Sequence, residues 1–190
     1  MGAKILVAYA SWAGTTADVA AAIASRLGDD GTADVRPAGE VADLSSYSGV
    51  VLGAAIRAGR PHRDARAFVA RHCSRLAQLP VACFVVCLTM KDDTPENRQK
   101  ARSFIDPVLN ACPDMHPVDV GLFAGAVPAG REALAKLPIM QRIILGAMKS
   151  TAGDFRDWPT IDAWADGLRG RLVGDQASGV PSVFRRRHFE

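Results

Sequence analysis

The sequence predicts an α/β fold in which helices cover both faces of one parallel β-sheet. Short apolar runs, suited to buried strands, alternate with longer amphipathic segments suited to helices. The chain has 190 residues, 48% of them hydrophobic, which is enough for one domain with a sizeable core. We therefore expect a single three-layer domain over residues 1–174, followed by a flexible basic tail over residues 175–190.

Five segments are predicted as strands because they are short, rich in apolar residues and bounded by turn-forming residues. They comprise residues 4–10, 33–37, 50–56, 81–88 and 118–127. The second is the least apolar, so we place it nearer an edge of the sheet. The third and fourth are almost continuously apolar, as expected of strands that are buried on both faces.

The segments between these strands carry apolar residues one helical turn apart. The first helix is marked by Val19, Ile23 and Leu27, and Gly28 punctuates its end. Further helices are expected through residues 68–76, through residues 104–109 and across residues 134–148. In the last helix one face is apolar, Asp157 is the expected cap and Pro159 suits the first turn. That face consists of Ile161, Trp164, Leu168 and Leu172.

The charge pattern argues against a dedicated nucleic-acid-binding protein. The net charge is +3, and acidic and basic residues are mixed along most of the chain. Only the tail concentrates positive charge, at Arg185, Arg186 and Arg187. No stretch approaches the roughly 20 apolar residues that a membrane-spanning helix needs. Because a strand-like run follows Lys4 directly, we expect no signal peptide and a cytoplasmic location.

The four cysteines lack the spacing of a metal site or of a CxxC redox pair. We interpret Cys73, Cys83, Cys87 and Cys112 as reduced thiols. Cys83 and Cys87 would lie on one face of a strand, but too far apart along it for a disulfide. The sequence predicts no metal site.

The loop between the first strand and the first helix consists of small and hydroxylated residues, Ser11-Trp12-Ala13-Gly14-Thr15-Thr16. A helix N-terminus offers free N–H groups and partial positive charge, which suit a phosphate. Gly14 allows close approach of the backbone. The loop lacks the patterns of a P-loop and of a dinucleotide site. An ordinary helix cap would use the same residue types, so the loop alone leaves both interpretations open.

The run from Leu6 to Thr16, followed by Val19 and Ala20, resembles the phosphate-loop signature of the flavodoxin family. The resemblance implies a flavodoxin-like three-layer sandwich with a five-stranded parallel sheet in the order 2-1-3-4-5. It also implies FMN as the cofactor, with the loop wrapped around its phosphate. At Ala13 the sequence departs from the family, where a threonine is common.

A second stretch narrows the resemblance to menaquinone-dependent protoporphyrinogen dehydrogenases, which oxidise a heme-biosynthesis intermediate with a quinone as acceptor. It is Gly53-Ala54-Ala55-Ile56-Arg57-Ala58-Gly59-Arg60-Pro61-His62. Phe123-Ala124-Gly125-Ala126 and an insertion closed by Asp157-Trp158 are also similar. The match covers about residues 3 to 172. The first part of the insertion, residues 128–132, has no aromatic residues, so the question whether a porphyrin is the substrate stays open.

Ligands of open parallel sheets lie past the carboxyl ends of the strands, where the strand order reverses; flavodoxin is itself the standing example of this rule. Three loops would meet there, and the last two would flank the flavin ring. The expected cofactor-binding residues are Ser11, Trp12, Ala13, Gly14, Thr15, Thr16, Ala54, Ala55, Ile56, Arg57, Gly59, Leu88, Thr89, Met90 and Gly125. No aromatic residue occurs at 89–93, so Trp12 or Met90 would cover the ring.

Arg57 and His62 each allow two interpretations. Arg57 directly follows the third strand and would stabilise a negatively charged reduced flavin, or it is a solvated loop charge. His62 is a candidate proton donor, or merely a residue that begins a helix. Residues 134–149 contain both aliphatic and basic side chains. Such a segment could contact a membrane face or a quinone, or it could pack over the sheet.

These features favour an FMN-dependent oxidoreductase that passes electrons to a quinone or another small-molecule acceptor, with the flavin as the reactive group. Peripheral membrane contact and a homo-oligomer are compatible with this hypothesis. The alternative is an electron carrier that docks to a redox protein, although such carriers are usually strongly acidic. A third hypothesis is a binding module that kept the fold and lost the cofactor.

Overall fold

The five predicted strands form one parallel sheet in the computed structural model, which describes residues 4–28, 32–127 and 153–173. They are β1 (Ile5–Ala10), β2 (Ala33–Pro37), β3 (Gly49–Arg57), β5 (Val81–Cys87) and β6 (Asp119–Ala124). Their order in the sheet is β2-β1-β3-β5-β6, so β2 is an edge strand. The predicted flavodoxin-like fold and strand order are confirmed.

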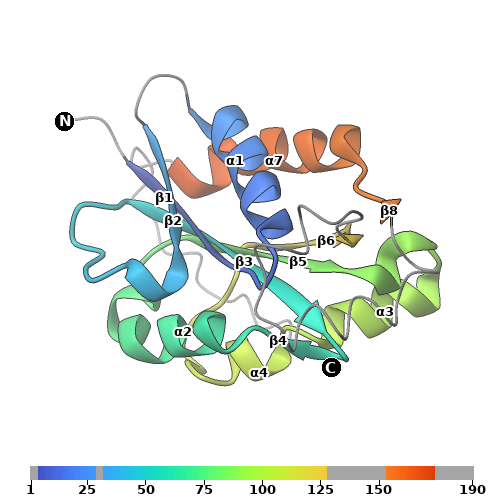
Figure 1. Cartoon of the computed structure of the whole chain (residues 1–190). Helices are drawn as coiled ribbons and strands as arrows, with labels where there is room; N and C mark the ends of the chain where they lie inside the picture. The colour runs from blue at the N-terminus through green and yellow to red at the C-terminus, as the bar shows by residue number, and fades with distance from the viewer. Residues whose placement is uncertain (1–3, 29–31, 128–152, 174–190) are drawn as a thin grey trace, which may run out of the picture.

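Helices cover both faces of this sheet (Figure 1). One face carries α1 (Thr15–Leu27) and α7 (Trp158–Val173); the other carries α2 (Arg63–Leu76), α3 (Pro95–Ser103) and α4 (Asp106–Leu109). The alternation of side chains along each strand supplies both cores. In β1, Ile5 and Val7 face α1 and α7, whereas Leu6 and Ala8 belong to the opposite core.

Aromatic packing fills the core beneath α7. The rings of Phe84 and Phe123 lie 6.1 Å apart, and that of Trp164 lies 5.4 Å from Phe123. A Cβ at Gly53 would lie 2.1 Å from the Phe84 ring, so only glycine fits beside it on β3. Asp157 caps α7 as predicted, because its Oδ1 accepts from the Thr160 N–H at 3.2 Å.

The observed secondary structure of several segments differs from the prediction. The predicted loop 57–62 contains a short strand, β4 (Arg60–Pro61), antiparallel to β3. The predicted fifth strand leaves the sheet after Ala124, and β7 (Ala126–Val127) pairs instead with β8 (Gly153–Asp154). Short 3₁₀ turns occupy Ala38–Glu40 and Leu88–Lys91. The predicted helix through residues 104–109 corresponds to the short helix α4, and a separate helix, α3, precedes it and ends at Ser103.

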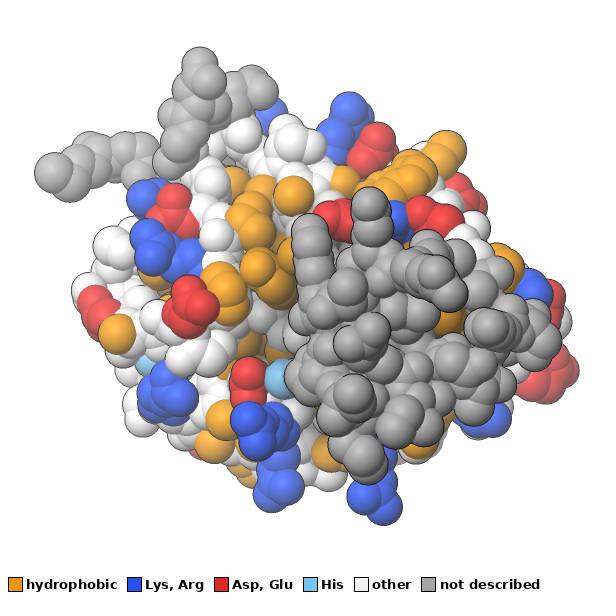
Figure 2. Space-filling model, in the orientation of Figure 1, with side chains coloured by type: hydrophobic (Ala, Val, Ile, Leu, Met, Phe, Trp, Pro, Cys, Tyr) orange, Lys and Arg blue, Asp and Glu red, His pale blue; other side chains and the backbone are white. Residues whose placement is uncertain are grey.

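Lys and Arg side chains lie interspersed with Asp and Glu on the face shown in Figure 2. Within the described ranges, no helix has the length and apolar character needed to cross a membrane. The predicted helix at 134–148 and the predicted tail at 175–190 lie outside the described residues.

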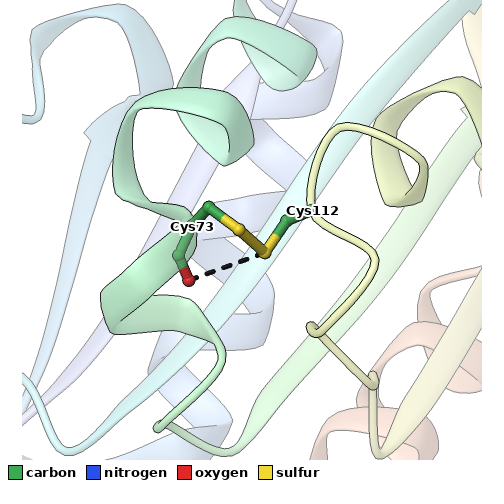
Figure 3. The surroundings of a disulfide bond; sticks show 2 residues. All are labelled: Cys73 and Cys112. Carbon is green, nitrogen blue, oxygen red and sulfur yellow. Dashed lines mark hydrogen bonds between the residues drawn. A yellow bond between two sulfur atoms is a disulfide. The ribbon is translucent and has the colours of Figure 1, made fainter.

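The prediction that all four cysteines are reduced thiols is wrong for two of them. Cys73 of α2 and Cys112, just after α4, form a disulfide across 39 positions of sequence (Figure 3). Sequence spacing did not reveal it because packing of α2 against α4 brings the two residues together. Cys83 and Cys87 are free and buried in β5.

We expect the Cys73→Ser/Cys112→Ser double variant to lose about 3–4 kcal/mol of unfolding free energy, because the disulfide restricts the unfolded chain. Urea unfolding without reductant measures the loss. Dithiothreitol should destabilise the wild type and leave the double variant unchanged. Alkylation of all four cysteines in denatured, unreduced protein would contradict the disulfide.

Candidate functional site

The first structural feature of the candidate site is the tight turn between β1 and α1. Gly14 precedes α1 with φ of 82°, a left-handed conformation that favours glycine. Its N–H donates to the Ser11 Oγ at 3.0 Å, and its carbonyl accepts from the Ala17 N–H at 2.8 Å. The turn therefore folds back on itself and presents the first N–H groups of α1, which have no acceptor within the helix.

Thr16 holds a buried hydroxyl without a partner at this turn. The residue is 0% exposed, and its Oγ1 has no hydrogen-bond partner among the described residues. Leaving a buried hydroxyl unpaired costs free energy that a bound acceptor would recover. Together with the helix N-terminus, this donor set fits a phosphate oxygen. The residues present thus fit the phosphate of a mononucleotide.

A cleft opens beside the turn, at the carboxyl ends of β1, β3 and β5. Most of the predicted cofactor-binding residues line it: Ser11, Trp12, Ala13, Thr15, Thr16, Ala55, Ile56, Arg57, Leu88 and Gly125. Four more were missed by sequence reasoning: Val86, Cys87, Ala126 and Val127. Val86 and Cys87 could have been found, since they directly precede Leu88 at the end of a strand. Ala126 and Val127 line the cleft because β7 turns away from the sheet, which no local pattern signals.

The other predicted site residues lie around this cleft without lining it. Gly14 caps α1, and Gly59 lies in the turn between β3 and β4. Ala54 is buried in the core, and so is Met90. Thr89 lies in the 3₁₀ turn that follows β5. Of the two residues predicted to cover a flavin ring, Trp12 alone lines the cleft.

One wall of the cleft is the hairpin of β3 and β4. Its two-residue turn has positive φ at both Ala58 (50°) and Gly59 (74°), as tight hairpins with right-handed strand twist require. Arg57 ends β3 on the cleft, and Arg60 lies opposite it in the register of the hairpin. Within the described part of the chain, no carboxylate forms an ion pair with either guanidinium. Arg57 therefore brings an uncompensated positive charge to the cleft.

His62 begins α2 and supports Trp12. Its Nδ1 accepts from the Asp64 N–H at 3.2 Å, so the ring acts as a helix cap. Its ring centroid lies 4.6 Å from that of Trp12. The side chain is 12% exposed, and burial lowers the pKa of His62. A neutral cap of this kind favours the structural interpretation of His62 over a proton donor.

The two free thiols are protonated at neutral pH. Burial raises the pKa of Cys83 to about 12, and burial also raises that of Cys87, which lines the cleft. Neither is therefore a thiolate nucleophile. Among the described residues no cluster of His, Cys, Asp and Glu could hold a metal ion. What the cleft offers is an apolar slot with hydroxyl and amide donors at one end and a guanidinium at its side.

These features define a class of protein. The sheet is parallel, and its order reverses between β1 and β3, where the turn that begins α1 and the cleft lie at the carboxyl ends of the strands. Residues 6–158 match the family model described as flavodoxin domain, and the chain belongs to that family.

The chain is also similar to a curated relative and to solved structures. Protoporphyrinogen IX dehydrogenase (quinone) of Escherichia coli strain K12 is 32% identical over 108 residues, 54% of this chain and 60% of the relative. The chain thus spans about three fifths of the length of the curated relatives it matches. Oxidised flavodoxin 2 from Bacillus cereus is 22% identical, with a TM-score of 0.46, over 77% of this chain and 99% of that one. A flavoprotein in complex with FMN from Lactobacillus acidophilus NCFM is 14% identical, with a TM-score of 0.45, over 64% and 93%.

Protonation of His62 should destabilise the fold. The unfolded chain takes up this proton near pH 6.5, and the folded protein only at lower pH. Stability is therefore complete above about pH 6.5 and falls as the pH drops through the lowered pKa. The His62→Asn variant keeps a capping acceptor without titrating. Its unfolding free energy, measured with urea between about pH 8 and pH 5, should fall less steeply than that of the wild type; equal slopes would contradict this account.

Proposed function

We propose that the protein is an FMN-dependent oxidoreductase that passes electrons from a small-molecule substrate to a quinone or another acceptor. The observation that carries the proposal is the buried, unpartnered Oγ1 of Thr16 at the N-terminus of α1, beside an apolar cleft. Thr16 is not the capping residue, since Gly14 caps α1, and its hydroxyl makes no hydrogen bond within the described chain.

Different residues of the cleft would bind the phosphate and the ring of FMN. Ser11, Thr15, Thr16 and the N–H groups of the turn would hold the phosphate, and the apolar ends of β3 and β5 would hold the ring. Bound FMN would supply the electron-transfer chemistry. The protein's part is to bind, to orient and to set the charge around the ring. Arg57 would stabilise negative charge gained on reduction, which favours two-electron chemistry.

The relative's name motivates the finer proposal that protoporphyrinogen is the substrate and a quinone the acceptor. The match to that relative is partial, and the segment 128–152, where the resemblance places an insertion, lies outside the described residues. We also propose a cytoplasmic location, with peripheral membrane contact through residues 134–149 if the acceptor is a membrane quinone. A homo-oligomer is compatible with these proposals.

Removing the Thr16 hydroxyl should weaken FMN binding and spare the fold. We expect Thr16→Val to raise the FMN dissociation constant by about tenfold or more, because a hydrogen bond to a charged group is lost. Riboflavin, which lacks the phosphate, should bind both proteins equally. Quenching of flavin fluorescence measures both constants.

Ser25→Ala, which removes a hydroxyl from the same helix farther from the cleft, is the matched control and should leave FMN binding unchanged. If the wild-type protein does not bind FMN at micromolar concentration, the proposed function is refuted.

If FMN binds, the proposed reaction is tested by anaerobic reduction of the FMN-loaded protein, followed by reoxidation with menaquinone analogues. A protoporphyrinogen assay is run in parallel. An electron carrier, the alternative, would react with one-electron protein partners and not with these quinones.

Arg57 should raise the reduction potential of the bound flavin. We expect Arg57→Gln to lower the two-electron midpoint potential by on the order of 30 mV, because a positive charge near the ring is lost. Spectroelectrochemical titration of the FMN-loaded protein measures the shift. Arg60→Gln removes the neighbouring charge outside the cleft and should shift the potential less. Equal shifts in the two variants would remove the specific role of Arg57.

A further inference from the structure

Arg156 joins the segment that precedes α7 to the first turn of α1. Its Nε and Nη2 donate to the two carboxylate oxygens of Asp154 at 2.8 and 2.6 Å. Its Nη1 donates to Asp18 Oδ2 at 2.8 Å and to the Thr15 carbonyl at 3.3 Å. Four acceptor oxygens, from three residues on two segments far apart in sequence, thus converge on one guanidinium, which is a geometry that lysine cannot reproduce.

The surroundings of Arg156 keep it charged and in place. Its side chain is only 11% exposed, and its guanidinium lies 4.6 Å from the centroid of the Trp158 ring. The hydrogen bonds to Asp154, the largest cause, raise the pKa of Arg156 above its usual value. Its carboxylate partners are more exposed, Asp154 at 49% and Asp18 at 63%. The forked geometry, and not burial of both partners, therefore distinguishes this arrangement from a typical surface ion pair.

Through β8, Arg156 also connects two parts of the cleft lining. β8 pairs with β7, whose residues Ala126 and Val127 line the cleft. The Phe155 N–H donates to the carbonyl of Gly125, another lining residue, at 3.3 Å. Arg156 follows directly and contacts Thr15, which also lines the cleft. One side chain therefore ties the turn that begins α1 to the β7–β8 part of the cleft lining.

Asp18 makes this connection electrostatically important. Its carboxylate lies in the first turn of α1, next to the turn with the phosphate-type donors. Uncompensated, that negative charge would repel a phosphate dianion at the same helix N-terminus. The Nη1 contact with Arg156 offsets this charge. Asp154 shares the same guanidinium, so the three side chains together carry one negative charge, and loss of Arg156 would leave two. The sequence shows Asp18 but not its partner, since the two residues are 138 positions apart.

We propose that Arg156 is a positioning residue for the cofactor phosphate: it offsets the negative charge of Asp18 and holds the Thr15 turn in its anion-binding shape. The proposal rests on the proposed function, because it assumes that this turn binds the phosphate of FMN. Arg156 itself does not line the cleft and so acts through Asp18 and Thr15. A purely stabilising ion pair would instead affect every ligand of the cleft alike.

The test compares FMN with riboflavin, which shares the ring and lacks the phosphate. In the full-length Arg156→Met variant, the FMN dissociation constant should rise about tenfold, as expected for an uncompensated charge close to the anion. The riboflavin constant should stay within about twofold of wild type. Adding Asp18→Asn removes the repelling charge, so the Arg156→Met/Asp18→Asn variant should recover most of the FMN affinity.

The matched control is Arg26→Met. Arg26 donates from its Nε to Asp166 Oδ1 at 2.8 Å and so joins the other end of α1 to α7. Losing it removes an ion pair of the same type between the same two regions, but far along the helix from the anion-binding turn. FMN and riboflavin affinities should both stay as in wild type.

The outcomes separate the two proposals. If the wild type binds no FMN, the proposed function fails. If the wild type binds FMN but Arg156→Met weakens FMN and riboflavin equally, or Asp18→Asn gives no rescue, the role of Arg156 is overturned. Should Arg156→Met fail to fold by circular dichroism, Arg156→Lys keeps the charge and loses the forked geometry; it should fold and show a smaller, still FMN-specific loss. A Lys variant with equal losses for both ligands also overturns the proposal.

Discussion

The electrostatics of one helix N-terminus organise this molecule. Where β1 turns into α1, unsatisfied N–H groups, the partial positive charge of the helix and the buried Thr16 hydroxyl converge on one point. A folded chain leaves such groups unpaired at a measurable cost, so their convergence supports the proposal that this turn binds an anion. Because this junction lies where the strand order reverses, the carboxyl ends of neighbouring strands supply an apolar slot beside it.

The remaining walls of the cleft are built from locally unusual backbone. The hairpin of β3 and β4 turns through Ala58, a non-glycine residue with positive φ, and thereby directs Arg57 to the cleft. His62, at the end of the same hairpin, caps α2 and packs against Trp12. On the opposite side β7 leaves the sheet and pairs with β8, which leads directly to Arg156. The hairpin turn and the divergence of β7 thus place two departures from regular structure at the cleft, where irregularity is compatible with function.

The four cysteines lie in two different environments. Cys83 and Cys87 lie within a buried strand, where burial raises their pKa values and keeps them protonated. Cys73 and Cys112 lie where two helical segments meet and form a disulfide that closes a long loop. Disulfides are uncommon in cytoplasmic proteins, so the redox state of this pair in the cell bears directly on the proposed location.

Apolar periodicity, capping residues and turn composition are local signals, so they predicted the strands, most of the described helices, the cap of α7 and most of the residues that line the cleft. Local signals did not predict the pairing of Arg156 with Asp18, the disulfide or the divergence of β7. Each depends on segments far apart in sequence that meet when both faces of the sheet are covered. The burial of Thr16 is of the same kind: its residue type is visible in the sequence, but its lack of a partner exists only in the packed fold.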